Sequence, residues 1–121
     1  HPAPPISAAG KERWADALGS INAATRAGDV PTLLVADVNA SWWHPVYRRV
    51  LSEGLVDAHR VLGAGLSVSW PANRWPPTFV RLDHALVDGP VQPRDIDDLH
   101  LPSTDHEAFV VVVAVGDPTI G

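Results

Sequence analysis

The spacing of apolar residues along the chain predicts alternating helices and strands. Residues 10–26 carry apolar side chains every three or four positions, which is the period of one helix face. A second helix is predicted over residues 41–54, where Pro45 suits the first turn and Gly54 suits the end. Residues 32–38 form a continuous apolar run with β-branched side chains, which is typical of a strand buried on both faces.

The second half of the chain predicts a long loop and three further strands. Residues 63–77 are rich in Gly, Pro, Ser and Trp and are predicted to form the loop. Strand patterns follow over residues 79–87, 91–101 and 107–115; Pro93 breaks the middle one, and the last is expected to be buried. The predicted fold class is therefore α/β, with a β-sheet of mixed strands packed with helices.

Side-chain alternation separates two neighbouring polar residues within the 79–87 strand. Successive side chains of a strand point to opposite faces, so Asp83 shares one face with Arg81, and His84 lies on the other face among apolar residues. We expect His84 to be a hydrogen-bonded core histidine, and His59, farther back in the chain, to be exposed. Asp83 is the better candidate for chemistry.

Composition narrows the class of protein. The chain has 121 residues, of which 45% are hydrophobic, and this is enough for one domain with a core. The net charge of -5 argues against binding nucleic acid by bulk electrostatics. There is no Cys, which excludes disulfides and thiolate metal sites, and there is no Met. The lack of Met and the start at His1 predict a fragment, a processed product or the ordered part of a longer chain.

Polar residues gather at three places, each at the end of a predicted strand or within one. Asp37 and Asn39 close the 32–38 run, Asp83 lies within the 79–87 strand, and Asp105 and His106 precede the last strand. Converging carboxylates, amides and imidazoles are the groups that hold a metal ion and an attacking water. Oxygen ligands without Cys favour Mg²⁺ or Mn²⁺ over zinc. Each cluster alone also has a structural interpretation, as a strand-to-turn signal or a cap.

The order and separation of these motifs resemble the C-terminal half of the endonuclease/exonuclease/phosphatase superfamily, the metal-dependent phosphoesterases with the pancreatic deoxyribonuclease fold. The chain has an apolar strand ending in (G/A)-D-x-N, an R-x-D-H strand and a (S/T)-D-H triplet, and its opening HPAPP resembles the strand-end histidine of that family. The resemblance implies that residues 1–121 form a single domain, the C-terminal portion of such a domain and roughly half of a four-layer α/β/β/α sandwich. Ala36 and Val38 stand where the family commonly has Gly and Phe, and Thr104 where it commonly has Ser.

The resemblance also implies roles for the polar residues. His106 would take the proton from the attacking water or stabilise that water, and Asp83 would hold the His106 imidazole in the correct tautomer. Asp105 would ligate the metal, Mg²⁺ or Mn²⁺. Asp37 would share the metal or orient the nucleophile.

The remaining candidate residues would contact the substrate. By the same resemblance, Asn39 would donate to the phosphoryl group, and His1 would contact the phosphate and protonate the leaving oxygen. Aromatic and cationic side chains near these clusters are candidate substrate-binding residues: Trp42, Trp70 and Arg81. For Trp70 a loop packed on the sheet is an equal alternative.

Two functions remain open from the sequence. The first is a metal-dependent phosphoesterase, a phosphodiesterase, nuclease or phosphatase, that is active in the intact protein and inactive as this fragment. Its partners would be a phosphate-ester substrate, whether nucleic acid, phospholipid or small phosphoester, and the N-terminal half of the same domain, which carries the family's metal-binding Glu. The second is a catalytically inactive binding or scaffold domain with the same fold. The SWPANRWPP loop resembles bacterial members whose catalytic domain follows membrane spans, which implies an extracytoplasmic domain of a membrane-anchored or secreted protein.

Overall fold

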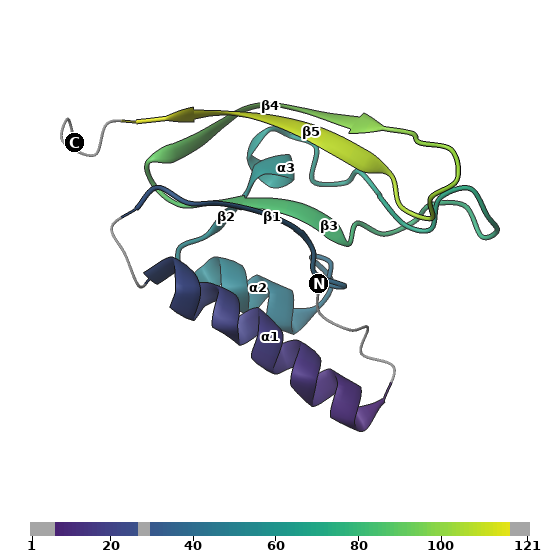
Figure 1. Ribbon diagram of the computed structural model, residues 1–121, viewed down its shortest axis with the longest axis horizontal. Coiled ribbons are helices and arrows are strands. Elements are labelled where there is room, and N and C mark those ends of the chain that lie inside the picture. Colours follow the sequence, from purple (N-terminus) through teal and green to yellow (C-terminus); the bar gives the residue numbers. More distant parts are fainter. Residues whose placement is uncertain (1–6, 27–29, 117–121) are drawn as a thin grey trace.

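The computed structural model describes residues 7–26 and 30–116, with the side chains of 24–26 left out, and confirms the α/β class. Two helices lie on one side of a three-stranded sheet, and a two-stranded hairpin lies on the other side (Figure 1). The elements in chain order are α1 (Ala8–Arg26), β1 (Leu33–Asp37), α2 (Pro45–Ser52), β2 (Val56–Asp57), α3 (Ala58–Val61), β3 (Asp83–Val87), β4 (Val91–Leu99) and β5 (Ala108–Val115).

β3 is the centre of the three-stranded sheet, whose strand order is β1-β3-β2. It pairs antiparallel with both neighbours, so β1 and β2 run in the same direction on either side of it. The strand predicted over residues 79–87 is shorter in the structure, where β3 begins only at Asp83. Before it, Val80 forms an isolated bridge with Trp70. β4 and β5 pair antiparallel, with an irregularity between Pro93 and Asp95, where proline has no N–H for the ladder.

The two long helices supply the core beneath the sheet. Leu18 of α1 is fully buried with Tyr47 and Val50 of α2, and the Trp14 indole N–H donates to the carbonyl of Val38 at 3.0 Å. Both helices were predicted, although α2 begins only at Pro45, in the first-turn position expected for that residue. No helix among the described residues is long and apolar enough to cross a membrane.

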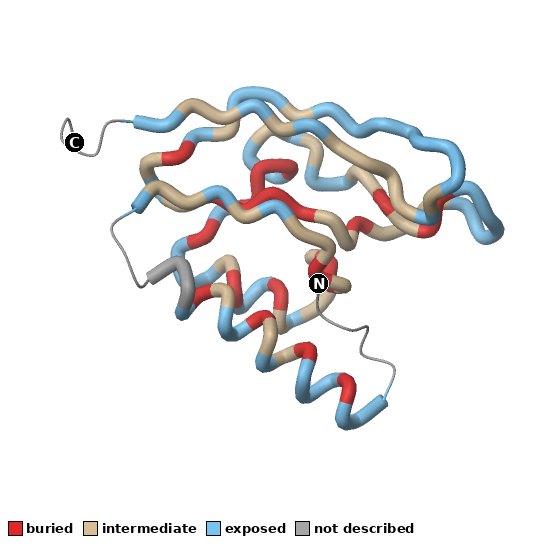
Figure 2. The backbone as a smooth tube through the Cα atoms, viewed as in Figure 1, coloured by how far each residue is buried: buried red, intermediate tan, exposed pale blue. Residues whose placement is uncertain are grey.

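The prediction that two apolar runs form fully buried strands is wrong. Leu33 and Val35 of β1 are 39% and 55% exposed, and Val110 and Val112 of β5 are each 52% exposed. Figure 2 shows buried positions concentrated on the helices and along β3, while the hairpin strands are mostly intermediate or exposed. The helices cover only one face of β1, and within residues 7–26 and 30–116 no other layer covers the exposed side chains of these strands.

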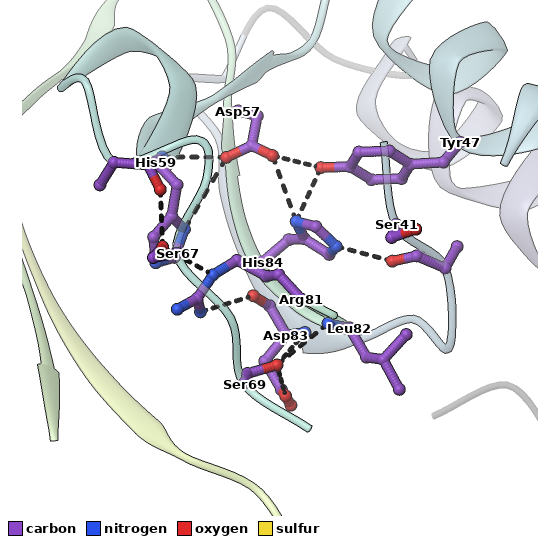
Figure 3. A network of polar contacts seen from close by, with 12 residues as sticks. Ser41, Tyr47, Asp57, His59, Ser67, Ser69, Arg81, Leu82, Asp83 and His84 are labelled. Atoms are coloured by element: carbon purple, nitrogen blue, oxygen red, sulfur yellow. Dashed lines mark hydrogen bonds and ion pairs between the residues drawn. The ribbon is translucent and has the colours of Figure 1, made fainter. Parts of the chain in front are cut away.

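A buried polar network lies between β3 and the helices (Figure 3). The Tyr47 hydroxyl donates to Asp57 Oδ2 at 2.6 Å, and His84 Nδ1 lies 3.1 Å from that oxygen and 2.9 Å from the hydroxyl. His84 Nε2 donates to the carbonyl of Ala40 at 2.7 Å, which confirms His84 as a hydrogen-bonded core histidine. Burial alone raises the pKa of Asp57, but its bonds with His84 and Tyr47 outweigh burial and hold that pKa below its ordinary value.

His59 is buried, so the prediction that it is exposed is wrong. Only 1% of its surface is exposed, because its ring packs edge-to-face on Phe109 with a centroid distance of 4.8 Å. Its Nε2 lies 3.5 Å from Asp98 Oδ1, which also accepts from Arg81 at 2.7 Å. Burial, followed by the charge of Arg81, lowers the pKa of His59. His59 therefore helps to join the hairpin to the sheet below it.

Replacing Tyr47 with Phe should lower the free energy of unfolding by about 1–3 kcal/mol, because buried Asp57 and His84 then lose a hydrogen-bond partner. Urea unfolding at neutral pH measures this change. The control is Arg49→Gln on the exposed side of the same helix, which should change stability by less than about 0.5 kcal/mol. Equal stability of Tyr47→Phe and the wild type would show that the hydroxyl contributes nothing to the fold.

Candidate active site

Two carboxylates face each other at one end of the sheet. Asp37 is the last residue of β1 and Asp83 is the first of β3, and the antiparallel register places the two residues directly opposite. Burial raises the pKa of Asp37, and the negative charge of Asp83 adds to this. The backbone N–H of Asn39, which donates to Asp37 Oδ1 at 2.9 Å, opposes the shift.

His106 joins these carboxylates from the loop before β5. Its Nδ1 lies 2.6 Å from Asp83 Oδ2, and its Nε2 lies 3.7 Å from Asp37 Oδ2. Burial lowers the pKa of His106, but the bond with Asp83 and the surrounding negative charges raise it overall. Because Asp83 accepts from Nδ1, the ring is held with Nε2 turned toward Asp37. These three residues are called the Asp37–Asp83–His106 cluster below.

Ser69 is a member of the site that sequence reasoning missed. Its hydroxyl donates to Asp83 Oδ2 at 2.7 Å and accepts from the backbone N–H of Leu82 at 3.0 Å. Ser69 is fully buried. Asp83 Oδ2 thus forms hydrogen bonds with both Ser69 and His106. The sequence offers no periodic or motif signal for this contact, because Ser69 lies in the long Gly- and Pro-rich segment before β3.

The other predicted polar residues lie around the cluster. Asp105 is 54% exposed, with its carboxylate 4.0 Å from His106 Nε2 and 3.7 Å from the Arg74 guanidinium. Asn39 follows β1 with a φ of 51°, a left-handed conformation that Asn tolerates better than most residues. His1 lies outside the described residues.

Arg81, predicted to bind substrate, is buried and engaged within the protein. Its guanidinium donates to Ser67 Oγ at 3.1 Å, to the Asp83 carbonyl at 3.3 Å and to Asp98 at 2.7 Å. These contacts link β3 to the hairpin and give Arg81 a structural role. A contact between Arg81 and substrate has no support in this arrangement.

Both predicted tryptophans are partly exposed. Trp42 is half-buried beneath the Arg60 guanidinium, which stacks 3.3 Å above its ring, and it lines a cavity of about 500 Å³. Trp70 packs edge-to-face on Phe79 with a centroid distance of 5.9 Å. This packing matches the alternative of a loop residue packed near the sheet, and contact of either tryptophan with substrate stays a prediction.

The residues of the cluster suit a hard cation. One ligand atom each from Asp37, Asp83 and His106 lies within 4.8 Å of the others. Burial raises the pKa of Asp37 most, and the negative charge of Asp83 adds to this; a bound cation would offset both effects. Asp83 is already hydrogen-bonded to both Ser69 and His106, which leaves Asp37 better placed to take a metal. Asp105, the other predicted ligand, is not part of this group of three.

Comparison with known proteins identifies what the chain is similar to. The model of the endonuclease/exonuclease/phosphatase family matches residues 1–106. A mannosyl-6-phosphatase of Bacteroides thetaiotaomicron VPI-5482 superposes with a TM-score of 0.60 at 19% identity, over 90% of this chain and 47% of that one. An endonuclease/exonuclease/phosphatase family protein of Bacteroides thetaiotaomicron gives a TM-score of 0.59 at 20% identity, over 93% and 48%. The chain thus spans about half the length of both structures, and no curated protein matches it.

Replacing Asp83 with Asn should lower the pKa of His106, because the bonded negative charge that raises this pKa is removed. In the wild type the imidazolium should persist to a pH above the ordinary histidine value of about 6.5. An NMR titration of the His106 ring in metal-free protein measures both values. The control Asp97→Asn, on an exposed position of β4, should leave the His106 titration unchanged. An unchanged titration in Asp83→Asn would mean that the 2.6 Å contact does not hold the proton.

Proposed function

The chain belongs to the endonuclease/exonuclease/phosphatase family, and on that premise we propose that it carries the general base of a divalent-metal-dependent phosphoric ester hydrolase. The observation that supports this most strongly is the 2.6 Å contact between Asp83 and His106, beside an Asp37 carboxylate 3.7 Å from the other ring nitrogen. A carboxylate-oriented imidazole with one nitrogen free for water is the arrangement that general-base catalysis needs.

The proposed roles follow from the hydrogen bonds of the site. Asp83 accepts from Nδ1–H of His106, so Nε2 of the neutral ring carries the lone pair that takes a proton from water. Ser69 fixes the Asp83 carboxylate by donating to the same oxygen. After the proton transfer, the imidazolium is stabilised by Asp83 and by the charge of Asp37. The electron pair of the water oxygen attacks phosphorus as the leaving oxygen departs on the opposite side.

The proposed metal is Mg²⁺ or Mn²⁺, held by Asp37 with Asp105 at the rim of the site. When bound, such an ion neutralises charge that develops on the phosphoryl oxygens. The Asn39 side chain, two residues after the end of β1, would donate to the phosphoryl group. Together these roles require the substrate phosphate to lie over the open end of β1 and β3.

We further propose that the partner of this chain is the N-terminal half of the same domain. In the part of the chain that the structure describes, four large apolar residues of β1 and β5 are exposed: Leu33, Val35, Val110 and Val112. Burying them against a second half would favour that contact. The two solved structures noted above are about twice as long as the matched region, which is the length that a second half requires. The substrate class proposed is a phosphate ester, and we include sugar phosphates among the esters to test because one structure of similar fold is a mannosyl-6-phosphatase.

The intact protein should hydrolyse bis(p-nitrophenyl) phosphate or p-nitrophenyl phosphate only when Mg²⁺ or Mn²⁺ is added, and a chelator should abolish the turnover. His106→Ala and Asp37→Ala should each lower kcat by about 100-fold or more, because each removes a group that acts on the water or the metal. Asp97→Asn serves as the matched control and should keep wild-type kcat. Turnover that resists chelation, or that survives both substitutions, would contradict the proposed metal site and general base, whereas no turnover under any of these conditions would favour a binding or scaffold domain.

Residues 1–121 alone should show little or no turnover under the same conditions, because the proposed partner half contributes the remaining metal-binding carboxylate. The comparison is kcat of the isolated chain against kcat of the intact protein, at equal metal concentration. Robust metal-dependent turnover by the isolated chain would overturn the proposed need for a partner while leaving the proposed chemistry in place.

A further inference from the structure

One short segment, residues 69–74, contacts both sides of the Asp83–His106 pair. At one end the Ser69 hydroxyl donates to Asp83 Oδ2, and the Ser69 carbonyl accepts from the backbone N–H of Glu107 at 2.7 Å. Farther along, the backbone N–H of Ala72 donates to the carbonyl of Asp105 at 2.7 Å. The segment therefore bonds to the residues immediately before and after His106.

Asn73 extends these contacts with its side chain. Its carboxamide nitrogen donates to the carbonyl of Leu101 at 2.7 Å and to the carbonyl of Thr104 at 2.8 Å. An amide nitrogen has two hydrogens, so both of its donors are used on one loop. The two carbonyls lie on either side of the turn that leads into His106.

The backbone of Asn73 supports this placement. Its φ of 57° is left-handed, a conformation that Asn and Gly adopt with less strain than other residues. The neighbouring ion pair between Arg74 and Asp105 is 3.7 Å long and about half exposed at both ends, so it is worth little on its own. The two hydrogen bonds of Asn73 to the His106 loop are thus shorter than the ion pair of Arg74 with the same loop.

We propose that Asn73 is a positioning residue for the Asp83–His106 pair: its carboxamide clamps the 101–107 loop onto residues 69–74, which also hold Asp83 through Ser69. This inference rests on the proposed function, because the geometry that it protects is that of the general base. Asp83 is fixed by β3, whereas His106 lies on a loop, so the 2.6 Å contact depends on the loop being held. Misplacing a catalytic group by about 1 Å can cost about 100-fold in rate.

The test compares Asn73→Gly and Asn73→Asp with the wild type in the intact protein, assayed with a p-nitrophenyl phosphate ester and Mg²⁺. Glycine accepts the left-handed backbone without strain and removes the side chain that carries the two donors. It should lower kcat about tenfold or more, with KM changed less than about twofold. Aspartate should lower kcat further, because a carboxylate oxygen then faces the carbonyls of Leu101 and Thr104. Hydrogen exchange at the amides of His106 and Glu107 should accelerate about tenfold in Asn73→Gly.

Ser103→Gly is the matched control, because Ser103 is exposed, has a left-handed φ of 69° and lies in the same loop. It should keep both wild-type kcat and wild-type exchange. Wild-type kcat and exchange in Asn73→Gly would overturn the proposal, as would a loss of kcat matched by a large fall in melting temperature and faster exchange throughout the protein. If the wild type shows no turnover, the proposed function fails, and the exchange rates at His106 and Glu107 then decide alone whether the clamp exists.

Discussion

The side-chain alternation of β3 is the constraint on which the rest of the structure depends. β3 pairs with strands on both edges, so its backbone cannot rotate, and Asp83 and His84 must point to opposite faces. His84 turns toward the helices and joins the network of Tyr47 and Asp57. Asp83 turns to the other face and meets His106. One dipeptide thus anchors the core on one side and the candidate active site on the other.

The two histidine–aspartate contacts differ in their surroundings, and this difference separates structure from chemistry. His84 and Asp57 are almost completely buried, and each atom of their contact has a protein partner. His106 is 25% exposed, and its Nε2 lies 3.7 Å from Asp37 Oδ2 at the end of the sheet. A buried pair whose polar atoms are all bonded within the protein is typical of a structural contact, whereas a half-buried pair at a strand end can exchange protons with a substrate or with water.

The sequence allowed some of this to be predicted, because period-2 and period-3.6 patterns report which face of a strand or helix is covered. The separation of Asp83 from His84 and the two long helices follow from such patterns. The patterns do not show which other elements cover a residue, and two predictions of burial were wrong for this reason. Val35 lies in the apolar strand β1 but is exposed, and His59 is polar but is buried against Phe109. Ser69 and Asn73 were missed for a different reason. Both residues lie in a loop and bond to residues 14 to 31 positions away, and the contacts of a loop have no period.

The site and the uncovered apolar surface lie on the same face of β1. Alternation places Asp37 on the side of Leu33 and Val35, and both of these apolar residues are exposed. Leu34 and Ala36, on the opposite side, pack against the helix core. Any layer that covers Leu33 and Val35 must therefore border Asp37 and can place a further ligand beside it. Because the geometry of β1 puts the exposed apolar residues and Asp37 on one surface, we propose that the partner half covers the apolar residues and completes the metal site when it binds.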